Sequence, residues 1–343
     1  MSSAAVANVD RARFSRELAA LNLKPLWERV IRLEPGTAAV PAIWRWAEVR
    51  PFLMRGTELI TAREAERRVL LLENPALPGT TFIATTLFAG LQTILPGEIA
   101  PTHRHTPNAL RFIIEGEGAY TAVDGERTTM RPGDFVMTPG WTWHDHGNLG
   151  SAPVVWLDGL DTPFGNMMGA TLREDYPQDT QPVTRPEGDA AARYGANLLP
   201  VDYRASGRAS PVFSYPYART REALAQLVRS GAPDPSHGYK LRYANPADGG
   251  HPFPTMAAFM QLLPDRFAGC GYRSTESTVF CVAEGRGSVG IGETRFDFAP
   301  HDVFVVPSWE PYRLDAQGDC VLFSYSDRAA QEALGFWREL SPP

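Results

Sequence analysis

The sequence predicts a mainly β protein in which one chain forms two small antiparallel barrels, with a helical arm before them and a helix after them. Two stretches of the 343-residue chain, residues 81–165 and 246–327, are rich in short β-prone runs bounded by Gly, Pro or Asp. The 30 glycines and 30 prolines are spread along the chain, which favours many short strands and turns over long helices. Short sequence segments of the first stretch recur in the second, as expected for two copies of one β-rich unit.

Residues 1–80 are predicted to form a helical and irregular N-terminal arm. Leu and Ala residues are spaced along the segment from Arg11 to Leu23 in a way that is typical of a helix. The two tryptophans of the segment Trp44–Trp46 indicate a part of the arm that packs on a core.

In the first strand-rich stretch we expect strands at Thr81–Thr85 and at Leu110–Ile114. The runs Ala119–Val123 and Glu126–Thr128 are separated only by Asp124-Gly125, which is a strong signal of a two-residue hairpin turn.

Residues 166–245 are richer in Pro, Asp and Arg, and are predicted to be a long linker packed on the barrels, with one helical piece near Arg221–Arg229. The second barrel follows at residues 246–327. Residues 328–343 are expected to form a closing helix with Ser326 or Asp327 as its N-cap. Its apolar face would carry Ala330, Ala333, Leu334 and Trp337.

The two strand-rich stretches align with each other. Ile114–Ala119 lines up with Ala283–Ser288, and Gly133–Pro139 lines up with His301–Pro307. After one further residue, each of the latter two segments is followed by a tryptophan, Trp141 or Trp309. Such a repeat of strand, Gly turn, strand and Pro turn argues for two barrels that each close their own edges.

The composition excludes several classes of partner. The formal charge is −6 with no run of Lys or Arg, which argues against nucleic acid. No apolar stretch reaches the roughly 18 residues needed to span a bilayer, and the N-terminus lacks the apolar segment of a secretory signal. The three cysteines show no CxxC spacing, which suggests buried free thiols. We therefore expect a cytoplasmic protein without a membrane partner.

Four of the seven histidines lie in two short clusters. Thr102–His105 places two imidazoles at positions i and i+2, which share one face of a β-strand. Trp141–His146 offers a third imidazole on a later strand, from either His144 or His146. Two such pairs at equivalent ends of neighbouring strands predict a metal site, whereas a lone buried His would be structural.

These histidines carry a resemblance to the cupin superfamily, which implies two double-stranded β-helix (jelly-roll) barrels. The first cupin motif is matched in register by Gly97, His103, His105 and Gly116. The second is matched by Gly133, Pro139, His144 and Asn148, with Trp141 in place of the motif's second Gly. The resemblance therefore implies that His103, His105 and His144 are the ligands.

One departure from the motif bears on the chemistry. The Glu ligand of many cupins would fall at Ala109, so three neutral imidazoles would leave about three positions open on a six-coordinate metal. Fe(II) held in this way keeps its double positive charge and favours an anionic chelating substrate.

The second repeat has lost the ligands. By the alignment, Tyr272, Ser274 and Tyr312 stand in the places of the three histidines. We expect one Fe(II) per chain, in the N-terminal barrel, and a C-terminal barrel without metal that serves packing and oligomer contacts.

Across nearly its whole length the chain resembles gentisate 1,2-dioxygenases and the related salicylate and 1-hydroxy-2-naphthoate dioxygenases. The matching stretches are Glu66–Arg68, Glu73–Pro75, Phe88–Gln92, His103–Phe112, Gly140–His146, Trp156–Asp161 and Val305–Trp309. The resemblance implies that iron binds the carboxylate and ortho hydroxyl of a small aromatic hydroxy acid. With O2 the ring then opens between the carbons that carry these groups, giving maleylpyruvate from gentisate. It also implies a homo-oligomer, a tetramer.

Three residues are the candidates for catalysis and for binding the substrate's charge. Arg111 lies on the strand after His105 among apolar neighbours, and we predict that it clamps the substrate carboxylate. Arg67 matches a second carboxylate contact of the family. His146 is two residues from His144, and is predicted to take the phenol proton or to steer bound oxygen.

Four further residues match positions of the family pocket. Gln92 and Asp158 are expected to line or support it, or merely to fill hydrogen bonds at the barrel mouth. Phe88 stands where relatives often carry another ring, and Gly90 is expected to leave space beside it. The substrate could therefore be gentisate, a 5-substituted salicylate such as the 5-nitro compound, or plain salicylate.

Two other classes of function compete with ring cleavage. One is a cupin oxygenase or isomerase acting on a non-aromatic anion, and the other is a non-catalytic, ligand-binding or storage bicupin. Storage barrels usually lose their metal ligands, whereas one barrel here keeps a full set.

Overall fold

The structure is a computed structural model that describes residues 3–196, 198–205 and 207–341, with side chains from residue 10 onward. The chain divides into two compact units, which are described separately below. The first ends at Gly36 and the second begins at Thr37.

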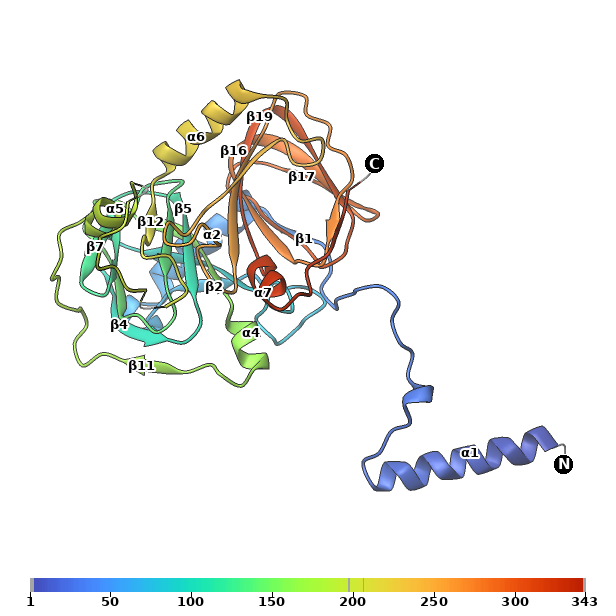
Figure 1. The fold of residues 1–343 in the computed structure, drawn as a ribbon. Helices are drawn as coiled ribbons and strands as arrows, with labels where there is room; N and C mark the ends of the chain where they lie inside the picture. The colour runs from blue at the N-terminus through green and yellow to red at the C-terminus, as the bar shows by residue number, and fades with distance from the viewer. Residues whose placement is uncertain (1–2, 197, 206, 342–343) are drawn as a thin grey trace. The chain divides into compact units, whose positions relative to one another are not determined.

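In the described part of the first unit, helix α1 (Ser3–Ala20) is followed by a 3-10 turn, η1 (Leu26–Glu28) (Figure 1). A hydrogen bond of 2.8 Å from Ser15 Oγ to Glu28 Oε1 links the two. The helix confirms the helical character expected after Arg11, but it ends at Ala20, before Leu23.

The second unit contains two β-barrels side by side (Figure 1). The N-terminal barrel is built from two sheets. The six-stranded sheet has the order β12 (Ser214–Tyr215), β8 (Phe135–Thr138), β5 (Ala109–Glu115), β10 (Val154–Leu160), β3 (Phe88–Ile94) and β2 (Val69–Leu71). The five-stranded sheet has the order β11 (Arg173–Asp175), β4 (Ile99–His105), β9 (His144–Asn148), β6 (Ala119–Val123) and β7 (Glu126–Thr129).

The C-terminal barrel is formed by a seven-stranded sheet. Its order is β1 (Ala42–Trp44), β18 (Val303–Val306), β16 (Thr278–Ile291), β19 (Tyr312–Ser326), β14 (Ala257–Leu263) and β13 (Tyr239–Arg242), with β17 (Thr294–Phe298) paired to β16. A small sheet of β15 (Arg273–Ser274) and β20 (Glu339–Leu340) lies apart from it. The prediction of a mainly β, two-barrel fold is thus confirmed.

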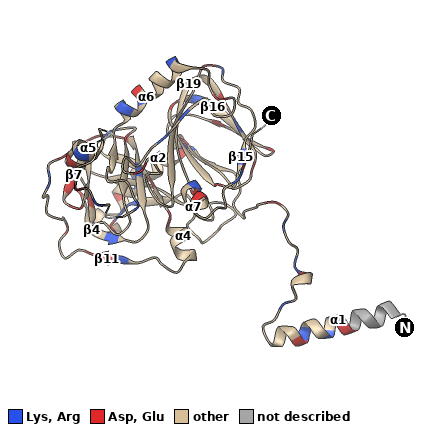
Figure 2. Ribbon diagram, in the orientation of Figure 1, with Lys and Arg blue, Asp and Glu red and all other residues tan. Residues whose placement is uncertain are grey.

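Short helices connect these strands. They are α2 (Trp46–Leu59), α3 (Ala62–Ala65), α4 (Thr162–Met167), α5 (Asp189–Tyr194), α6 (Tyr217–Ser230) and α7 (Arg328–Ala333). Helix α6 contains the helical piece expected at Arg221–Arg229. Among the described residues, no helix has the length and apolar character needed to cross a membrane. Residues of both charge signs are interspersed along the elements (Figure 2).

The hairpin predicted at Asp124-Gly125 is confirmed. Val123 faces Glu126 across the two-residue turn, and the turn residues have φ angles of 43° and 85°. Positive φ at both central residues is the geometry of the type I′ turns that join tightly paired strands.

The strand predicted at Thr81–Thr85 is wrong. This segment is irregular, and the backbone N–H groups of Ile83 and Ala84 both bond the carbonyl of Leu87 in a tight turn. Ile83 and Ala84 are fully buried, so the apolar run reports burial and not sheet pairing. The first long strand of this barrel begins at Phe88.

The closing helix expected at 328–343 is also wrong in length. It ends at Ala333, and Gly335, with φ of 74°, turns the chain toward β20. Asp327 is the N-cap, but its carboxylate accepts bonds from Thr86 Oγ1 and from the backbone N–H of Ser277 instead of capping the helix.

The arm predicted at 1–80 is not purely helical and irregular, because β1 joins the C-terminal barrel through β18 and β2 joins the N-terminal barrel through β3. The division of the chain at residues 80, 165, 245 and 327 stays a prediction. The two barrels also share core contacts, since Phe112 stacks on Phe323 with ring centroids 4.3 Å apart.

Candidate metal centre

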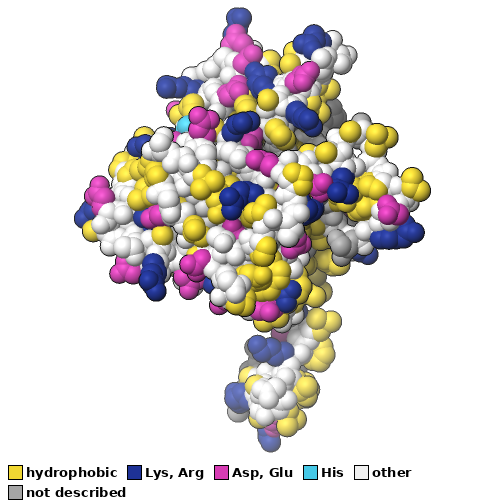
Figure 3. All heavy atoms as spheres, turned by 90° about the vertical axis from the view of Figure 1, so that its left-hand side faces the viewer, with side chains coloured by type: hydrophobic (Ala, Val, Ile, Leu, Met, Phe, Trp, Pro, Cys, Tyr) yellow, Lys and Arg dark blue, Asp and Glu magenta, His cyan; other side chains and the backbone are white. Residues whose placement is uncertain are grey.

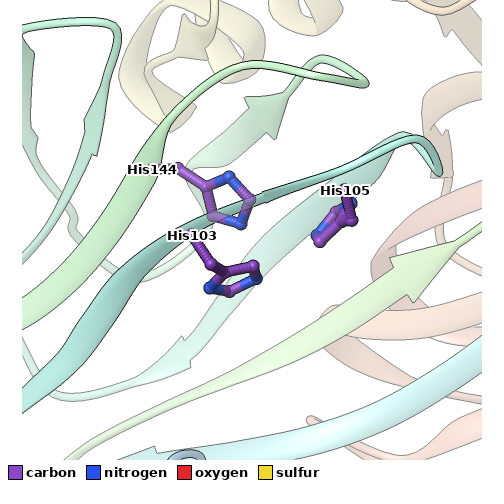
Figure 4. A group of neighbouring side chains, drawn as sticks. All are labelled: His103, His105 and His144. Atoms are coloured by element: carbon purple, nitrogen blue, oxygen red, sulfur yellow. The ribbon is translucent and has the colours of Figure 1, made fainter. Parts of the chain in front are cut away.

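Two neighbouring strands bring three histidines together. His103 and His105 lie on β4, two residues apart, so that both side chains leave the strand on the same side. His144 begins β9 and is the direct cross-strand partner of His103. Figure 4 shows the three imidazoles gathered at one point, where one nitrogen from each lies within 4.8 Å of the others.

The hydrogen bonds of the three rings leave the same nitrogen of each available. Nδ1 of His103, His105 and His144 faces the carbonyl oxygen of Pro101, Pro107 and Thr142, at 3.3, 2.7 and 3.0 Å. Bonds of this kind fix the tautomer and the orientation of metal-ligating imidazoles. The buried Nε2 of His144 has no hydrogen-bond partner among the described residues, which is the kind of orphaned atom that a metal ion would satisfy.

Burial keeps the three imidazoles neutral, which is the form that binds a metal. It lowers the pKa of His103 to about 2 and that of His105 to about 4, with the charges of Arg67 and of other neighbours acting in the same direction. It also lowers the pKa of His144 well below its ordinary value. Three neutral nitrogen ligands without a carboxylate fit a metal ion that keeps open positions, and Ala109, at the place of the usual Glu, is buried.

Arg111 lies on β5 as a buried side chain with two anchors. Its Nη1 donates to Thr138 Oγ1 at 2.6 Å, and its Nε lies 3.4 Å from Asp158 Oδ1. The Trp156 indole also donates to Asp158 Oδ1, at 3.0 Å. Burial raises the pKa of Asp158 to about 6, against the opposing effect of the Arg111 charge, and lowers the pKa of Arg111. One hydrogen bond and one ion contact therefore orient the guanidinium, while its buried Nε has no hydrogen-bond partner among the described residues.

Arg67 reaches the site from the loop after α3. Its Nη2 lies 2.6 Å from His103 Nδ1 and 3.0 Å from the carbonyl of Pro101. Burial and the charge of Arg111 lower the pKa of Arg67 to about 9. A neutral imidazole bound to metal through Nε2 carries its hydrogen on Nδ1, so it cannot also accept from Arg67. Metal binding at His103 therefore requires this guanidinium to turn away from Nδ1.

His146 lies deeper along β9, with its ring centroid 5.8 Å from that of His144. Its Nδ1 is 2.9 Å from Thr121 Oγ1, and its buried Nε2 has no hydrogen-bond partner among the described residues. Burial and the charge of Arg111 hold the pKa of His146 well below its ordinary value. The group of three close ligand atoms includes His144 and not His146.

The three candidates on β3 pair with β10, where Phe88 lies opposite Leu160. Gln92 is buried opposite Trp156, and Gly90 lies opposite Asp158. The space expected beside Gly90 is not there: a Cβ at this residue would lie 2.5 Å from Val69 Cγ1 and 3.4 Å from the Phe88 ring. Val69 of the edge strand β2 fills it.

Two contributors were missed by the sequence reasoning. Thr138 bonds Arg111 from β8, and Val69 fills the space at Gly90. Thr138 lies within the second cupin motif but at a position that the motif leaves open, and Val69 lies outside both motifs, so only the pairing of their strands with β5 and β3 could have indicated them.

At the corresponding positions of the C-terminal barrel, Tyr272 and Tyr312 bond each other's backbone, and Ser274 lies on β15. Among the described residues, the group on β4 and β9 is the one cluster of three His, Cys, Asp or Glu ligands close enough to share an ion.

Comparison with known proteins agrees with this geometry. The family described as cupin domain matches residues 90–159, which contain all three histidines. Over 333 residues the chain is 52% identical to gentisate 1,2-dioxygenase 1 of Aquipseudomonas alcaligenes, covering 96% of each protein. The chain belongs to the gentisate and salicylate 1,2-dioxygenase family.

Other members of the family extend the likeness. The chain is 36% identical to 5-aminosalicylate 1,2-dioxygenase of a Comamonas species, covering 94% of this chain and 88% of that protein. The crystal structure of salicylate 1,2-dioxygenase from Pseudoaminobacter salicylatoxidans in adducts with gentisate superposes with a TM-score of 0.90 at 34% identity, covering 96% of this chain and 93% of that one. The family consists of ring-cleaving oxidoreductases, so the chain is an enzyme of this class.

Proposed function

We propose that the protein is an Fe(II)-dependent gentisate 1,2-dioxygenase, which opens the ring between the carboxyl-bearing and hydroxyl-bearing carbons to give maleylpyruvate. The observation that carries the proposal is a cluster of three neutral imidazoles without a carboxylate ligand, close to the half-buried Arg67 and to the charge of the buried Arg111. Such a site combines an open metal face with fixed positive charge, which suits a substrate that chelates through a carboxylate and a phenolate.

His103, His105 and His144 would hold the iron through Nε2. When bound, Fe(II) would supply the one-electron chemistry that lets dioxygen react with an organic ring. The protein's own part is to keep three imidazoles neutral and aimed at one point, through the carbonyls of Pro101, Pro107 and Thr142.

Arg111 would bind the substrate carboxylate. A guanidinium offers two parallel donors that match a carboxylate, and the anchors at Thr138 and Asp158 hold its orientation before the substrate arrives. Arg67, once turned away from His103, would supply the second contact to the same charge.

His146 is suited to accept the phenol proton at Nε2. The hydroxyl of Thr121 donates to Met130 Sδ at 3.2 Å, so its oxygen is left to accept a hydrogen bond from Nδ1–H of His146. In that tautomer Nε2 carries the lone pair of the ring and is the atom that can accept a proton. The ring thus has an acceptor that is buried and not yet paired with any described residue.

Salicylate or a 5-substituted salicylate is the second candidate substrate, because relatives that cleave such rings share this fold. Phe88 and Gln92 on β3 are the proposed contacts to the ring, whereas Val69 fills the space at Gly90 between them, and Asp158 acts on Arg111. We further propose that the enzyme is a cytoplasmic homotetramer.

An anaerobic titration followed by oxygen tests the proposal. The protein is loaded with Fe(II), mixed with gentisate, salicylate or 5-nitrosalicylate, and exposed to air while the absorbance of the ring-fission product is recorded. Gentisate should give the highest kcat/KM. Tight binding without turnover would identify a binding protein, and turnover of non-aromatic anions alone would identify a different cupin enzyme.

A further inference from the structure

A third arginine, Arg173, lies on β11, the strand next to the one that carries His103 and His105. Strand β11, from the segment after the first barrel, pairs with β4 so that Arg173 faces His105 and Asp175 faces His103. Directly opposed residues of antiparallel strands project on the same face of the sheet. The side chain of Arg173 therefore leaves β11 on the face from which His105 reaches the metal centre.

Arg173 does not point freely into the site, because it is held by two carboxylates. Its Nη2 lies 2.8 Å from Glu66 Oε2 and 2.7 Å from Asp175 Oδ1. Glu66 directly precedes Arg67, and its backbone has φ of 53° and ψ of −47°. Residues other than Gly, Asn and Asp adopt a positive φ only at a cost in free energy, so contacts with the surroundings are needed to keep Glu66 in this conformation.

We propose that Arg173 is a positioning residue: through its ion pair with Glu66 it fixes the strained turn from which Arg67 reaches the metal centre, and so sets the affinity for the substrate's carboxylate. This inference rests on the proposed function, in which Arg67 contacts that carboxylate.

The attachment of β11 to the barrel does not depend on this ion pair. On the opposite face, Arg104 bonds Glu174 at 2.6 Å and lies between Trp141 and Trp143, 4.4 Å from each ring centroid. The backbone adds bonds on either side of β11, from the Thr106 N–H to the carbonyl of Leu172 and from the Thr102 N–H to the carbonyl of Asp179. The strand should therefore stay in place without the side chain of Arg173. The contact that this side chain adds outside its own strand is the ion pair with Glu66.

Loss of the pair should also leave the fold intact. The side chains of Arg173 and Glu66 are 48% and 57% exposed, so removal of either leaves no buried unpaired charge. Figure 3, which faces the side of the molecule that contains the N-terminal barrel, shows Lys and Arg side chains beside Asp and Glu over much of this face, and hardly any histidine.

The test compares Arg173→Gln, Glu66→Gln, Arg67→Ala and the double variant Arg67→Ala/Arg173→Gln, all as iron-loaded full-length protein. Each Gln variant should raise KM for gentisate about two- to fivefold, in the range of a partly exposed ion pair, while kcat changes less than twofold. In the Arg67→Ala background, Arg173→Gln should have no further effect on KM. Arg173→Lys, which keeps the charge, should lie closer to the wild type.

Arg193→Gln is the matched control, because it removes an exposed ion pair with Asp189 on α5. Its KM should equal that of the wild type. A KM that rises with Arg173→Gln even when Arg67 is absent would overturn the proposal, as would a fall in kcat at unchanged KM.

Anaerobic titration of the same variants with salicylate gives dissociation constants that do not depend on turnover. If the wild type binds salicylate but cleaves no 2-hydroxybenzoate, the proposed function fails while the dissociation constants still decide the role of Arg173. If the wild type is active and the dissociation constants do not change, the role of Arg173 fails alone.

Discussion

The two barrels of this chain share a backbone and differ in what it carries. In the N-terminal barrel His103 is paired across strands with His144, and in the C-terminal barrel Tyr272 is bridged in the same way to Tyr312. The likeness extends to a strained tryptophan in each barrel.

Trp141 and Trp309 both have φ of 66°, and their N–H groups bond the carbonyls of His105 and Ser274 at 2.7 Å in each case. A bulky side chain at positive φ is uncommon, so two such residues in equivalent places mark the same turn. The aligned repeat in the sequence therefore corresponds to a repeat in space.

The difference lies in the polar atoms that face the barrel mouth. The imidazoles of the first barrel leave their Nε2 atoms available, whereas the hydroxyl of Tyr272 donates to Glu339 Oε2 of β20 at 2.8 Å. Burial raises the pKa of Tyr272 and that of Tyr312, so both stay neutral phenols, which are weak metal ligands. The two barrels thus share a backbone arrangement, and the side chains at three equivalent positions determine whether it can bind a metal.

The largest effect is expected at the histidines of the first barrel, where two neighbouring positions should respond differently. His144→Ala should be iron-poor and inactive, because only two protein ligands remain. His146→Ala should keep its iron and lose about 10²- to 10⁴-fold in turnover, as expected for the loss of a proton acceptor. Iron content and kcat, measured on the same preparations, check both. The reverse pattern would exchange the two roles, and equal iron loss would indicate four histidine ligands.

Arg111→Ala should have the next largest effect, because the buried and anchored guanidinium is the proposed contact to the substrate carboxylate. We expect a loss of about 3 kcal/mol of transition-state stabilisation, as for the truncation of a charge-assisted bidentate contact. Arg111→Lys should recover only part of it, because an ammonium lacks the planar fork. The measurement is kcat/KM for gentisate on folded, iron-loaded protein. A near-normal value for Arg111→Ala would remove Arg111 from the site.

A smaller effect is expected in the pH profile, through Asp158. Its pKa is raised from 3.8 to about 6, whereas burial keeps the pKa values of the site histidines well below this range. As pH falls below about 6, Asp158 becomes protonated and no longer supports the charge of Arg111, so kcat/KM should fall. Asp158→Asn should lack this acid limb. An unchanged limb in that variant would assign it to another group.

The same shift affects stability with the opposite sign. Because the folded-state pKa is raised, the contribution of Asp158 to stability is full below about pH 4 and is lost as pH rises through about 6. Thermal unfolding of the metal-free protein at several pH values should show this contribution, and Asp158→Asn should remove it.

The sequence was sufficient for the parts of the molecule that local rules decide. The Asp124-Gly125 hairpin follows from turn chemistry, and the spacing of His103 and His105 follows from the two-residue period of a strand. The choice of His144 over His146 as the third close imidazole needed the cupin motif, since both lie on the same strand.

The parts that the sequence did not reveal depend on contacts between distant segments. The apolar run at Thr81–Thr85 is buried by neighbours rather than paired as a strand, and Val69 fills the space at Gly90 from an edge strand. The contact of Arg67 with His103 joins residues 36 positions apart, and no local pattern encodes it. Neither does any pattern show that β11 closes the edge of the sheet that carries the histidines.

The most direct test of the account is the number of iron ions per chain. The protein is reconstituted anaerobically with Fe(II), freed of excess metal, and analysed for iron beside His103→Ala and Tyr272→Phe. Wild type and Tyr272→Phe should each contain one iron per chain, and His103→Ala should contain close to none. Two ions per chain in the wild type, or unchanged iron in His103→Ala, would contradict the claim that the N-terminal barrel alone holds the metal.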